Sequence, residues 1–308
     1  MTNISFIMVG DVRVRLRELP DECVNTVVTS PPYFGLRDYG NDGQIGLENT
    51  PERYVAELVS VFEEVKRVLR NDGTVWLNLG DSYHADGRKG RAHMGIGKNT
   101  GYSAWMNKTS PETKPKDILG IPWMVAFALR SNGWYLRQDI IWHKPNVMPE
   151  SVKDRCTKAH EYVFLLSKQP NYYFDHEAIK EPAAQPDRVR ADRIGGNKYV
   201  EGIKHSDGSI FTGSQTRNRR SVWSINTKPF RGAHFAVFPE ALVEPCVLAG
   251  SPTGGMILDP FGGSGTTGVV ANRLGRDAIL CEINPDYAKL AQNRIEQAGY
   301  EVELNSIS

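Results

Sequence analysis

Short apolar runs that end in turn-forming residues recur along this 308-residue sequence and constrain its fold more than any other feature. Residues 24–29 form one such run and lead into Ser30-Pro31-Pro32-Tyr33. Residues 256–258 form another and lead into a glycine-rich segment at 259–267. Each has the pattern of a buried strand followed by a tight turn. Because open α/β sheets bind ligands at such turns, both segments are candidate ligand sites.

Strand and helix patterns alternate over most of the chain. Pro51 after Thr50 predicts that the longest helix begins there, with Thr50 as its N-cap. The expected strands cover residues 5–9, 24–29, 74–79, 134–143, 162–167, 256–258 and 277–281, and those at 134–143 and 162–167 fit a hairpin. The expected helices cover residues 12–19, 51–69, 122–130, 239–248, 266–274 and 286–298. This alternation predicts a parallel, doubly wound sheet.

The composition excludes several broad classes of protein. The formal net charge is only +1, so any nucleic-acid surface must arise from local segregation of charge. The four cysteines form no C-x-x-C pair, which favours reduced thiols in a cytosol over disulfides. No apolar run approaches the roughly 18 residues of a membrane span, and no signal-peptide pattern opens the chain. We therefore expect a cytoplasmic protein without a membrane partner.

The glycine-rich segment suits close contact between the backbone and a ligand. Gly262, Gly263 and Gly265 can adopt positive φ and leave room for a bound molecule. The segment lacks the lysine of a P-loop, which argues against a nucleoside triphosphate. Glu282 ends the strand expected at 277–281, where dinucleotide folds hold ribose hydroxyls. A simple tight turn and a surface glutamate are the structural alternatives, but the combination favours a binding site.

Both turns resemble motifs of one enzyme family. Thr29-Ser30-Pro31-Pro32-Tyr33 resembles the catalytic loop of the DNA methyltransferases that modify exocyclic amino groups. Asp259-Pro260-Phe261-Gly262-Gly263-Ser264-Gly265-Thr266-Thr267 resembles their S-adenosylmethionine loop. The catalytic motif comes first, as in the circularly permuted beta group. The resemblance implies an α/β fold with a doubly wound, Rossmann-like, mostly parallel sheet, in a bacterial or phage-type methyltransferase.

The resemblance also implies which residues hold S-adenosylmethionine. The loop residues would line its methionine end, and Asp11 would accept a hydrogen bond from the adenine amino group. The expected cofactor-binding residues are Asp11, Asp259, Phe261, Gly263, Gly265, Thr266, Glu282 and Asn284.

The catalytic turn would activate a poor nucleophile, because the lone pair of an exocyclic amino nitrogen is delocalised into the ring. The Ser30 hydroxyl and the Pro31 carbonyl would accept its two N–H bonds, and Pro31 and Pro32 would keep the turn rigid. Tyr33 would stack on the flipped base. The expected catalytic residues are Ser30, Pro31, Pro32 and Tyr33, with no metal. By the same resemblance, Asp139 and Trp142-His143-Lys144-Pro145 lie at a strand end near where the family closes over the flipped base. The dipeptides His160-Glu161 and His176-Glu177 are expected to be structural or solvent-facing.

Two basic segments are candidates for binding double-stranded DNA. Residues 84–116 hold seven Lys or Arg against two acidic residues, and residues 185–220 hold eight against four. Such segments suit phosphate contacts, although solvated loops are the simpler alternative. The expected DNA-contacting residues are Arg88, Lys89, Arg217, Arg219 and Arg220. The expected organisation is a catalytic half at 1–180 with a basic loop at 84–116, a basic target-recognition insertion at 181–222, and a cofactor-binding half at 223–308.

The target base and two rival functions stay open. Ser30 resembles N4-cytosine enzymes more than N6-adenine enzymes, although some adenine enzymes carry the same motif. A methyltransferase acting on RNA or a small molecule is one rival. A non-catalytic DNA-binding protein is the other, and both intact motifs argue against it. The sequence does not show the recognition sequence, the oligomeric state, or whether a separate restriction nuclease acts with the protein.

Overall fold

A computed structural model describes residues 3–84 (except 37, 39 and 42), 113–183, 215–228 and 238–305. The chain divides into two compact units, one formed by residues 1–174 and 221–308 and the other by residues 175–220. The second unit overlaps the insertion expected at 181–222, and its assignment to target recognition stays a prediction.

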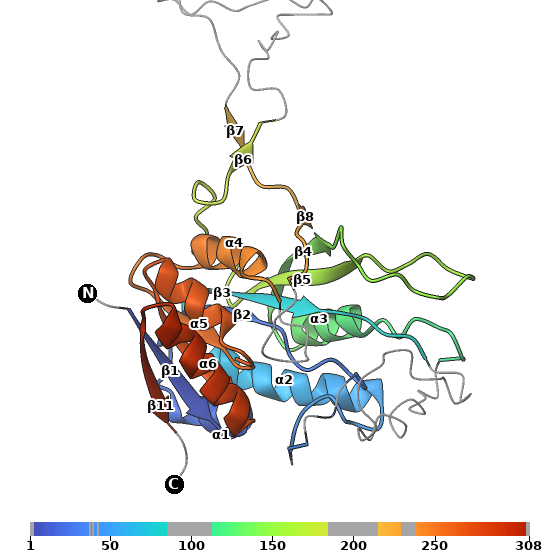
Figure 1. Ribbon diagram of the computed structural model, residues 1–308, viewed down its shortest axis with the longest axis horizontal. Helices are drawn as coiled ribbons and strands as arrows, with labels where there is room; N and C mark the ends of the chain where they lie inside the picture. Colours follow the sequence, from blue (N-terminus) through green and yellow to red (C-terminus); the bar gives the residue numbers. More distant parts are fainter. Residues whose placement is uncertain are drawn as a thin grey trace, which may run out of the picture. The chain divides into compact units, whose positions relative to one another are not determined.

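A nine-stranded sheet of the described residues organises the first unit (Figure 1). Its order is β11 (Glu301–Asn305), β1 (Ile4–Val9), β10 (Asp277–Glu282), β9 (Met256–Asp259), β2 (Val24–Thr29), β3 (Leu69–Leu79), β5 (His160–Ser167), β4 (Tyr135–His143) and β8 (Val222–Ser224). Only β5 runs antiparallel to its neighbours, β3 and β4. The remaining pairs are parallel. The expected mostly parallel α/β fold is confirmed, including the hairpin of β4 and β5.

Helices cover both faces of this sheet. They are α1 (Val12–Arg15), α2 (Pro51–Val68), α3 (Ile121–Ser131), α4 (Glu240–Gly250), α5 (Thr266–Arg273) and α6 (Pro285–Gln297), with a short 3-10 helix, η1 (Leu16–Glu18), after α1. The hydroxyl of Thr50 accepts a hydrogen bond from the Arg53 amide at 3.3 Å, so Thr50 is the N-cap of α2 as expected. Figure 1 shows α2 and α3 on one side of the central strands and α4 to α6 on the other.

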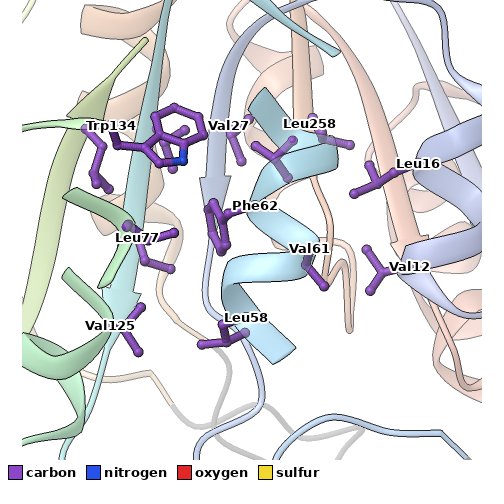
Figure 2. Packing of buried hydrophobic residues seen from close by; sticks show 14 of the residues in the cluster. Val12, Leu16, Val27, Leu58, Val61, Phe62, Leu77, Val125, Trp134 and Leu258 are labelled. Atoms are coloured by element: carbon purple, nitrogen blue, oxygen red, sulfur yellow. The ribbon is translucent and has the colours of Figure 1, made fainter. Parts of the chain in front are cut away.

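Alternating side chains of the central strands supply both layers of the core. Val27 and Leu77 are fully buried on the α2 face, where Figure 2 shows Phe62 of α2 pointing toward them. Thr26 lies on the α4 face, where a Cβ at Gly250 would come within 2.5 Å of its hydroxyl oxygen. Successive side chains of each strand point to opposite faces of the sheet. One face therefore packs a large apolar layer against α2, and the other packs closely against α4.

Three strands of the nine-stranded sheet differ most from the sequence predictions. Strand β3 begins at Leu69, five residues before the expected start, because Leu69 already has extended backbone at the end of α2. The residues expected to stop the helix, 71–73, instead form an irregularity in the pairing of β2 with β3. Strands β8 and β11 were not expected. The first has only three residues, and the second alternates between exposed and partly buried residues at the sheet edge.

The helices of the described ranges fall short of a membrane span in length or hydropathy. None of them is long and apolar enough to cross a bilayer.

Candidate active site

Strand order brings the two sequence motifs together. Strands β2 and β9 are parallel neighbours with Val27 opposite Leu258, so the turns that follow them lie side by side. Thr29 at the end of β2 donates a hydrogen bond of 2.6 Å to Asp259 at the end of β9, across 230 residues of sequence. The turns after β1 and β10 emerge at the same edge because those strands are also parallel.

One cavity in the first unit opens between these turns. The expected site residues that line it are Asp11, Ser30, Pro31, Pro32, Tyr33, Phe261, Gly263, Thr266 and Glu282. Asp259, Gly265 and Asn284 were also expected at the cofactor, but they do not line the cavity. Each of these three residues has another structural position.

Asp259 joins the cofactor loop to the catalytic strand. Its side chain is fully buried and accepts hydrogen bonds from the hydroxyls of Thr29 and Thr267, each at 2.6 Å, and from the Phe261 amide at 3.1 Å. Burial raises the pKa of Asp259 to about 6, although these three hydrogen bonds act to lower it. Asp259 therefore positions the loop from below rather than lining the cavity.

Gly265 and Asn284 shape the helices that follow the two cofactor turns. Gly265 precedes α5 with a φ of +77°, and a Cβ there would lie 2.8 Å from the Cβ of Ala291 in α6. Asn284 is the N-cap of α6, and its side chain accepts a hydrogen bond of 2.8 Å from the Asp286 amide. Both residues set the backbone next to the cavity.

Glu282 lies at the wall of the cavity with both carboxylate oxygens engaged by backbone. One oxygen accepts from the Gly263 amide and the other from the Asn284 amide, each at 2.8 Å. Burial raises the pKa of Glu282 to about 7, while these backbone bonds act to lower it. The carboxylate thus links the glycine-rich loop to the end of β10 and keeps further lone pairs for a ligand hydroxyl.

Asp11 lines the cavity beside the end of β10, because the preceding Gly10 amide donates to the Glu282 carbonyl at 2.8 Å. It is the N-cap of α1, accepts from the Arg13 amide at 2.8 Å, and pairs with the Arg13 guanidinium at 2.5 Å. Burial acts to raise the pKa of Asp11, but the hydrogen bonds and charge of Arg13 outweigh it and lower that pKa. Arg13 is itself held by Glu57 at 2.8 Å, which fixes the charged carboxylate in place.

The catalytic turn is held by one internal hydrogen bond and by bonds with α2 and β5. The Tyr54 hydroxyl of α2 donates to the Pro32 carbonyl at 2.9 Å. The Ser30 hydroxyl donates to the Tyr33 hydroxyl oxygen at 3.3 Å, and Tyr33 donates to Glu161 at 2.8 Å. Burial and then the charge of Glu161 raise the pKa of Tyr33 well above its usual value. Tyr33 is therefore a neutral hydroxyl that donates.

Glu161 is a site residue that the sequence analysis missed. The solvent-facing alternative was wrong, because the Glu161 side chain is 16% exposed, lines the cavity and bonds Tyr33, whereas the structural alternative agrees with these contacts. Its other oxygen pairs with Lys144, whose ammonium lies 4.3 Å from the centroid of the Trp142 ring. Asn78 also lines the cavity and was missed. The expected hairpin of β4 and β5 was the one signal that could have located Glu161.

The expected DNA-contacting residues are described in part. Arg217 and Arg220 belong to the second unit, where both donate to one oxygen of Glu181 at 2.8 Å. Glu181 belongs to β6 (Glu181–Pro182), which pairs with β7 (Thr216–Arg217). Burial acts to raise the pKa of Glu181, but hydrogen bonds and charge from the two arginines lower it. Arg88 and Lys89 lie outside the described residues, and all DNA contacts, including that of Arg219, stay predictions.

Potential metal ligands do not cluster in the described ranges. These ranges contain no group of three or more His, Cys, Asp or Glu side chains that could hold a metal ion.

A methyltransferase of amino groups requires one cavity that holds both the methyl donor and the acceptor base. The rigid Ser-Pro-Pro-Tyr turn and the glycine-rich loop share such a cavity, and the family that the sequence matches agrees with this interpretation. The model of the N6/N4 family described as DNA methylase matches residues 24–293, so the chain belongs to that family of DNA methylases. The expected family is confirmed.

Individual relatives agree with this assignment. The type II methyltransferase M.SmaI of Serratia marcescens is 51% identical over 290 residues, which cover 94% of this chain and 90% of that protein. The type II methyltransferase M.Cfr9I of Citrobacter freundii is 48% identical over 288 residues, which cover 93% of this chain and 86% of that protein.

Two solved structures share the fold. The cytosine-N4-specific PvuII DNA methyltransferase aligns with a TM-score of 0.64 and 20% identity, over 100% of this chain and 97% of that one. TTHA0409 of Thermus thermophilus, in complex with S-adenosyl-L-methionine, aligns with a TM-score of 0.61 and 24% identity, over 98% of this chain and 100% of that one.

Proposed function

We propose that this protein transfers a methyl group from S-adenosylmethionine to the exocyclic amino nitrogen of a DNA base, preferably N4 of cytosine. The observation that carries the proposal is the single cavity lined both by Ser30–Tyr33 and by the loop containing Phe261 and Gly263. Methyl donor and acceptor must approach within about 3–3.5 Å, so a shared cavity is necessary for direct transfer.

The residues of the cofactor side fit S-adenosylmethionine. Glu282 and Asp11 are acceptors suited to ribose hydroxyls and to an adenine amino group, and both would repel a polyphosphate. Gly263 has a φ of +51°, which places backbone rather than a side chain against the ligand. When bound, S-adenosylmethionine supplies an electrophilic methyl group on a sulfonium centre. The structure of TTHA0409 with this cofactor supports the assignment.

The acceptor side fits an amino group rather than a ring carbon. The Ser30 hydroxyl oxygen and the Pro31 carbonyl accept the two N–H bonds, which draws the nitrogen toward tetrahedral geometry. Tyr33 presents its ring to the cavity for stacking against a flipped base. The rigid Pro31-Pro32 backbone keeps the acceptors in place before the base arrives.

We favour cytosine over adenine because Ser30 occupies the position of the acceptor side chain, as in the N4-cytosine enzymes that the motif resembles. N6-adenine methylation is the alternative with the same site. The similarity to M.SmaI, a type II methyltransferase, favours a role beside a restriction nuclease encoded elsewhere. Arg217, Arg219 and Arg220, together with Arg88 and Lys89, are proposed to contact DNA phosphates or base edges.

The test is methylation of double-stranded DNA of diverse sequence, followed by mass spectrometry of the nucleosides. We expect N4-methylcytosine from the wild type and a loss of about 10²–10³-fold in rate for Ser30→Ala. Ser60→Ala is the matched control, because Ser60 is an exposed residue of α2 that bonds only the Glu57 carbonyl among the described contacts.

The nucleoside product decides among the alternatives. N6-methyladenine would overturn the cytosine preference, and methylation of RNA alone would overturn the DNA assignment. Full activity of Ser30→Ala would contradict the role of the turn.

A further inference from the structure

A hydrogen-bond chain runs from the catalytic turn to a carboxylate on another strand. The Ser30 hydroxyl donates to the Tyr33 oxygen at 3.3 Å, and the Tyr33 hydroxyl donates to Oε2 of Glu161 at 2.8 Å. Glu161 comes from the start of β5, and its Oε1 pairs with the Lys144 ammonium at the end of β4. The family motif at Ser30–Tyr33 includes neither Glu161 nor Lys144.

The carboxylate determines the direction of this chain. An ionised carboxylate can only accept hydrogen bonds, so Tyr33 must donate to Glu161 and its oxygen is left to accept from Ser30. The Ser30 hydroxyl therefore donates to Tyr33, and its oxygen keeps a lone pair that can accept a hydrogen bond from a group in the cavity. A longer contact of 3.2 Å joins the Tyr33 hydroxyl to Oδ1 of Asn78.

Asn78 holds the carboxylate in position. Its amide nitrogen donates to Oε2 of Glu161 at 3.2 Å and to the Tyr162 carbonyl at 3.1 Å. Because that nitrogen faces Glu161, the amide oxygen faces Tyr33 as a second, more distant acceptor for its hydroxyl. The direction of the chain is thus set by groups that cannot reverse it.

We propose that Glu161 orients Ser30 as an acceptor and takes up the proton that the amino group loses on methylation. This inference rests on the proposed function. As the N–CH3 bond forms and the S–CH3 bond breaks, the nitrogen gives its proton to Ser30, Ser30 gives its own to Tyr33, and Tyr33 gives its own to Glu161. The sulfonium becomes a neutral thioether, and the carboxylate becomes a neutral acid.

This charge balance favours the transfer. A positive sulfonium and a negative Glu161 are both neutral afterwards, while the Lys144 ammonium keeps its charge over the Trp142 ring. A methylated exocyclic nitrogen that still carries the extra proton is a far stronger acid than a carboxylic acid, so the net transfer from the nitrogen to Glu161 runs downhill. The 16% exposure of the Glu161 side chain then allows the proton to pass to solvent.

Several titratable groups lie around Glu161 and bear on the pH dependence of the methylation rate. Lys144 pairs with it directly, and Lys158, His160 and Tyr33 interact with it electrostatically. Burial lowers the pKa of Lys158 and of His160. The charged forms of Lys144 and Lys158 stabilise the ionised carboxylate of Glu161, which is the form that can take up a proton.

The test compares Glu161→Gln, Tyr33→Phe and their double variant in single-turnover methylation across pH. Glutamine keeps the size of Glu161 and can accept from Tyr33 but cannot take a proton at this position. We expect each single variant to lose about 10²–10³-fold in rate. The double variant should lose no more than either single variant, because both changes interrupt one chain.

Two further readouts separate proton uptake from a merely structural role. The wild-type rate should fall on acidification, because only an ionised carboxylate can take up the proton, and Glu161→Gln should lack this acid-side fall. Dissociation constants for S-adenosylmethionine and for DNA should stay within about twofold of the wild type. Glu64→Gln is the matched control, because it removes a comparable ion pair with Arg67 outside the cavity.

Distinct results would overturn the inference. A Glu161→Gln rate within threefold of the wild type, losses that multiply in the double variant, or an acid-side fall that persists without Glu161 would each do so. If Glu161→Gln fails to fold by circular dichroism, Tyr33→Phe alone decides, since it removes one hydroxyl from the same chain. A wild type without methyl transfer to DNA would instead refute the proposed function.

Discussion

The buried Asp259 carboxylate predicts an unusual response to substitution by asparagine. Asp259 is fully buried and accepts from the hydroxyls of Thr29 and Thr267. In Asp259→Asn, the amide oxygen can keep the bond from Thr29, while the amide NH2 faces Thr267. The Thr267 hydroxyl also lies 3.4 Å from the Val28 carbonyl, so it can rotate to donate there and accept from the new amide.

The magnitude follows from the pKa of the aspartate. Burial raises the pKa of Asp259 from 3.8 to about 6, which at about 1.4 kcal/mol per unit amounts to about 3 kcal/mol against the charged form. The folded state therefore binds a proton that the unfolded state has lost between about pH 4 and 6. The contribution of this group to stability falls as pH rises through that window and stays low above pH 6.

Urea unfolding of the wild type and of Asp259→Asn at several pH values measures this effect. The stability of the variant relative to the wild type should rise by about 3 kcal/mol from pH 4 to pH 7, because only the wild type buries a charge. The difference in free energy of unfolding between the two proteins at each pH cancels the contribution of all other titrating groups. Asp72→Asn, at an exposed aspartate of β3, is the control for introducing an amide. A stability difference that does not change with pH would refute the reasoning.

Three further predictions concern the cofactor loop and the second unit. Glu282→Gln should raise the Kd for S-adenosylmethionine by about 10-fold or more in calorimetry, because a charged acceptor for hydroxyls is lost; an unchanged Kd would remove Glu282 from the binding site. Gly265→Ala should lower the free energy of unfolding by at least about 1–3 kcal/mol in chemical denaturation, since its φ is +77° and its Cβ would meet Ala291 at 2.8 Å; wild-type stability would contradict the packing. Arg220→Ala should weaken DNA binding and reduce the salt dependence of log K by about one in fluorescence anisotropy; an unchanged slope would show that Arg220, which also pairs with Glu181, makes no phosphate contact.

The two motif turns could be predicted because their chemistry is local. Consecutive prolines restrict φ at 31 and 32 without help from the rest of the chain. Glycine at 263 and 265 permits positive φ, and the structure has +51° and +77° there. Short apolar runs predict strands such as β2 and β9, and the bounds of these two strands agree with the prediction to within one residue.

The role of Asp259 could not be predicted in the same way. Its motif indicates a place at the cofactor, but its hydroxyl partners include Thr29, which lies 230 residues away. Only the adjacency of β2 and β9 makes that contact, and sheet order depends on long-range packing. Asp259 is therefore a buried residue that positions the glycine-rich loop from beneath it.

The sequence by itself determined the apolar strands, the rigid catalytic turn and the glycine-rich loop, because backbone restriction and side-chain periodicity act over a few residues. The tertiary structure alone decided that Glu161 belongs to the site. Glu161 stands near the start of its strand, which in a parallel strand would lie at the far edge of the sheet. Because β5 runs antiparallel to β3, its start lies at the edge where β3 ends, and Glu161 meets Tyr33 there.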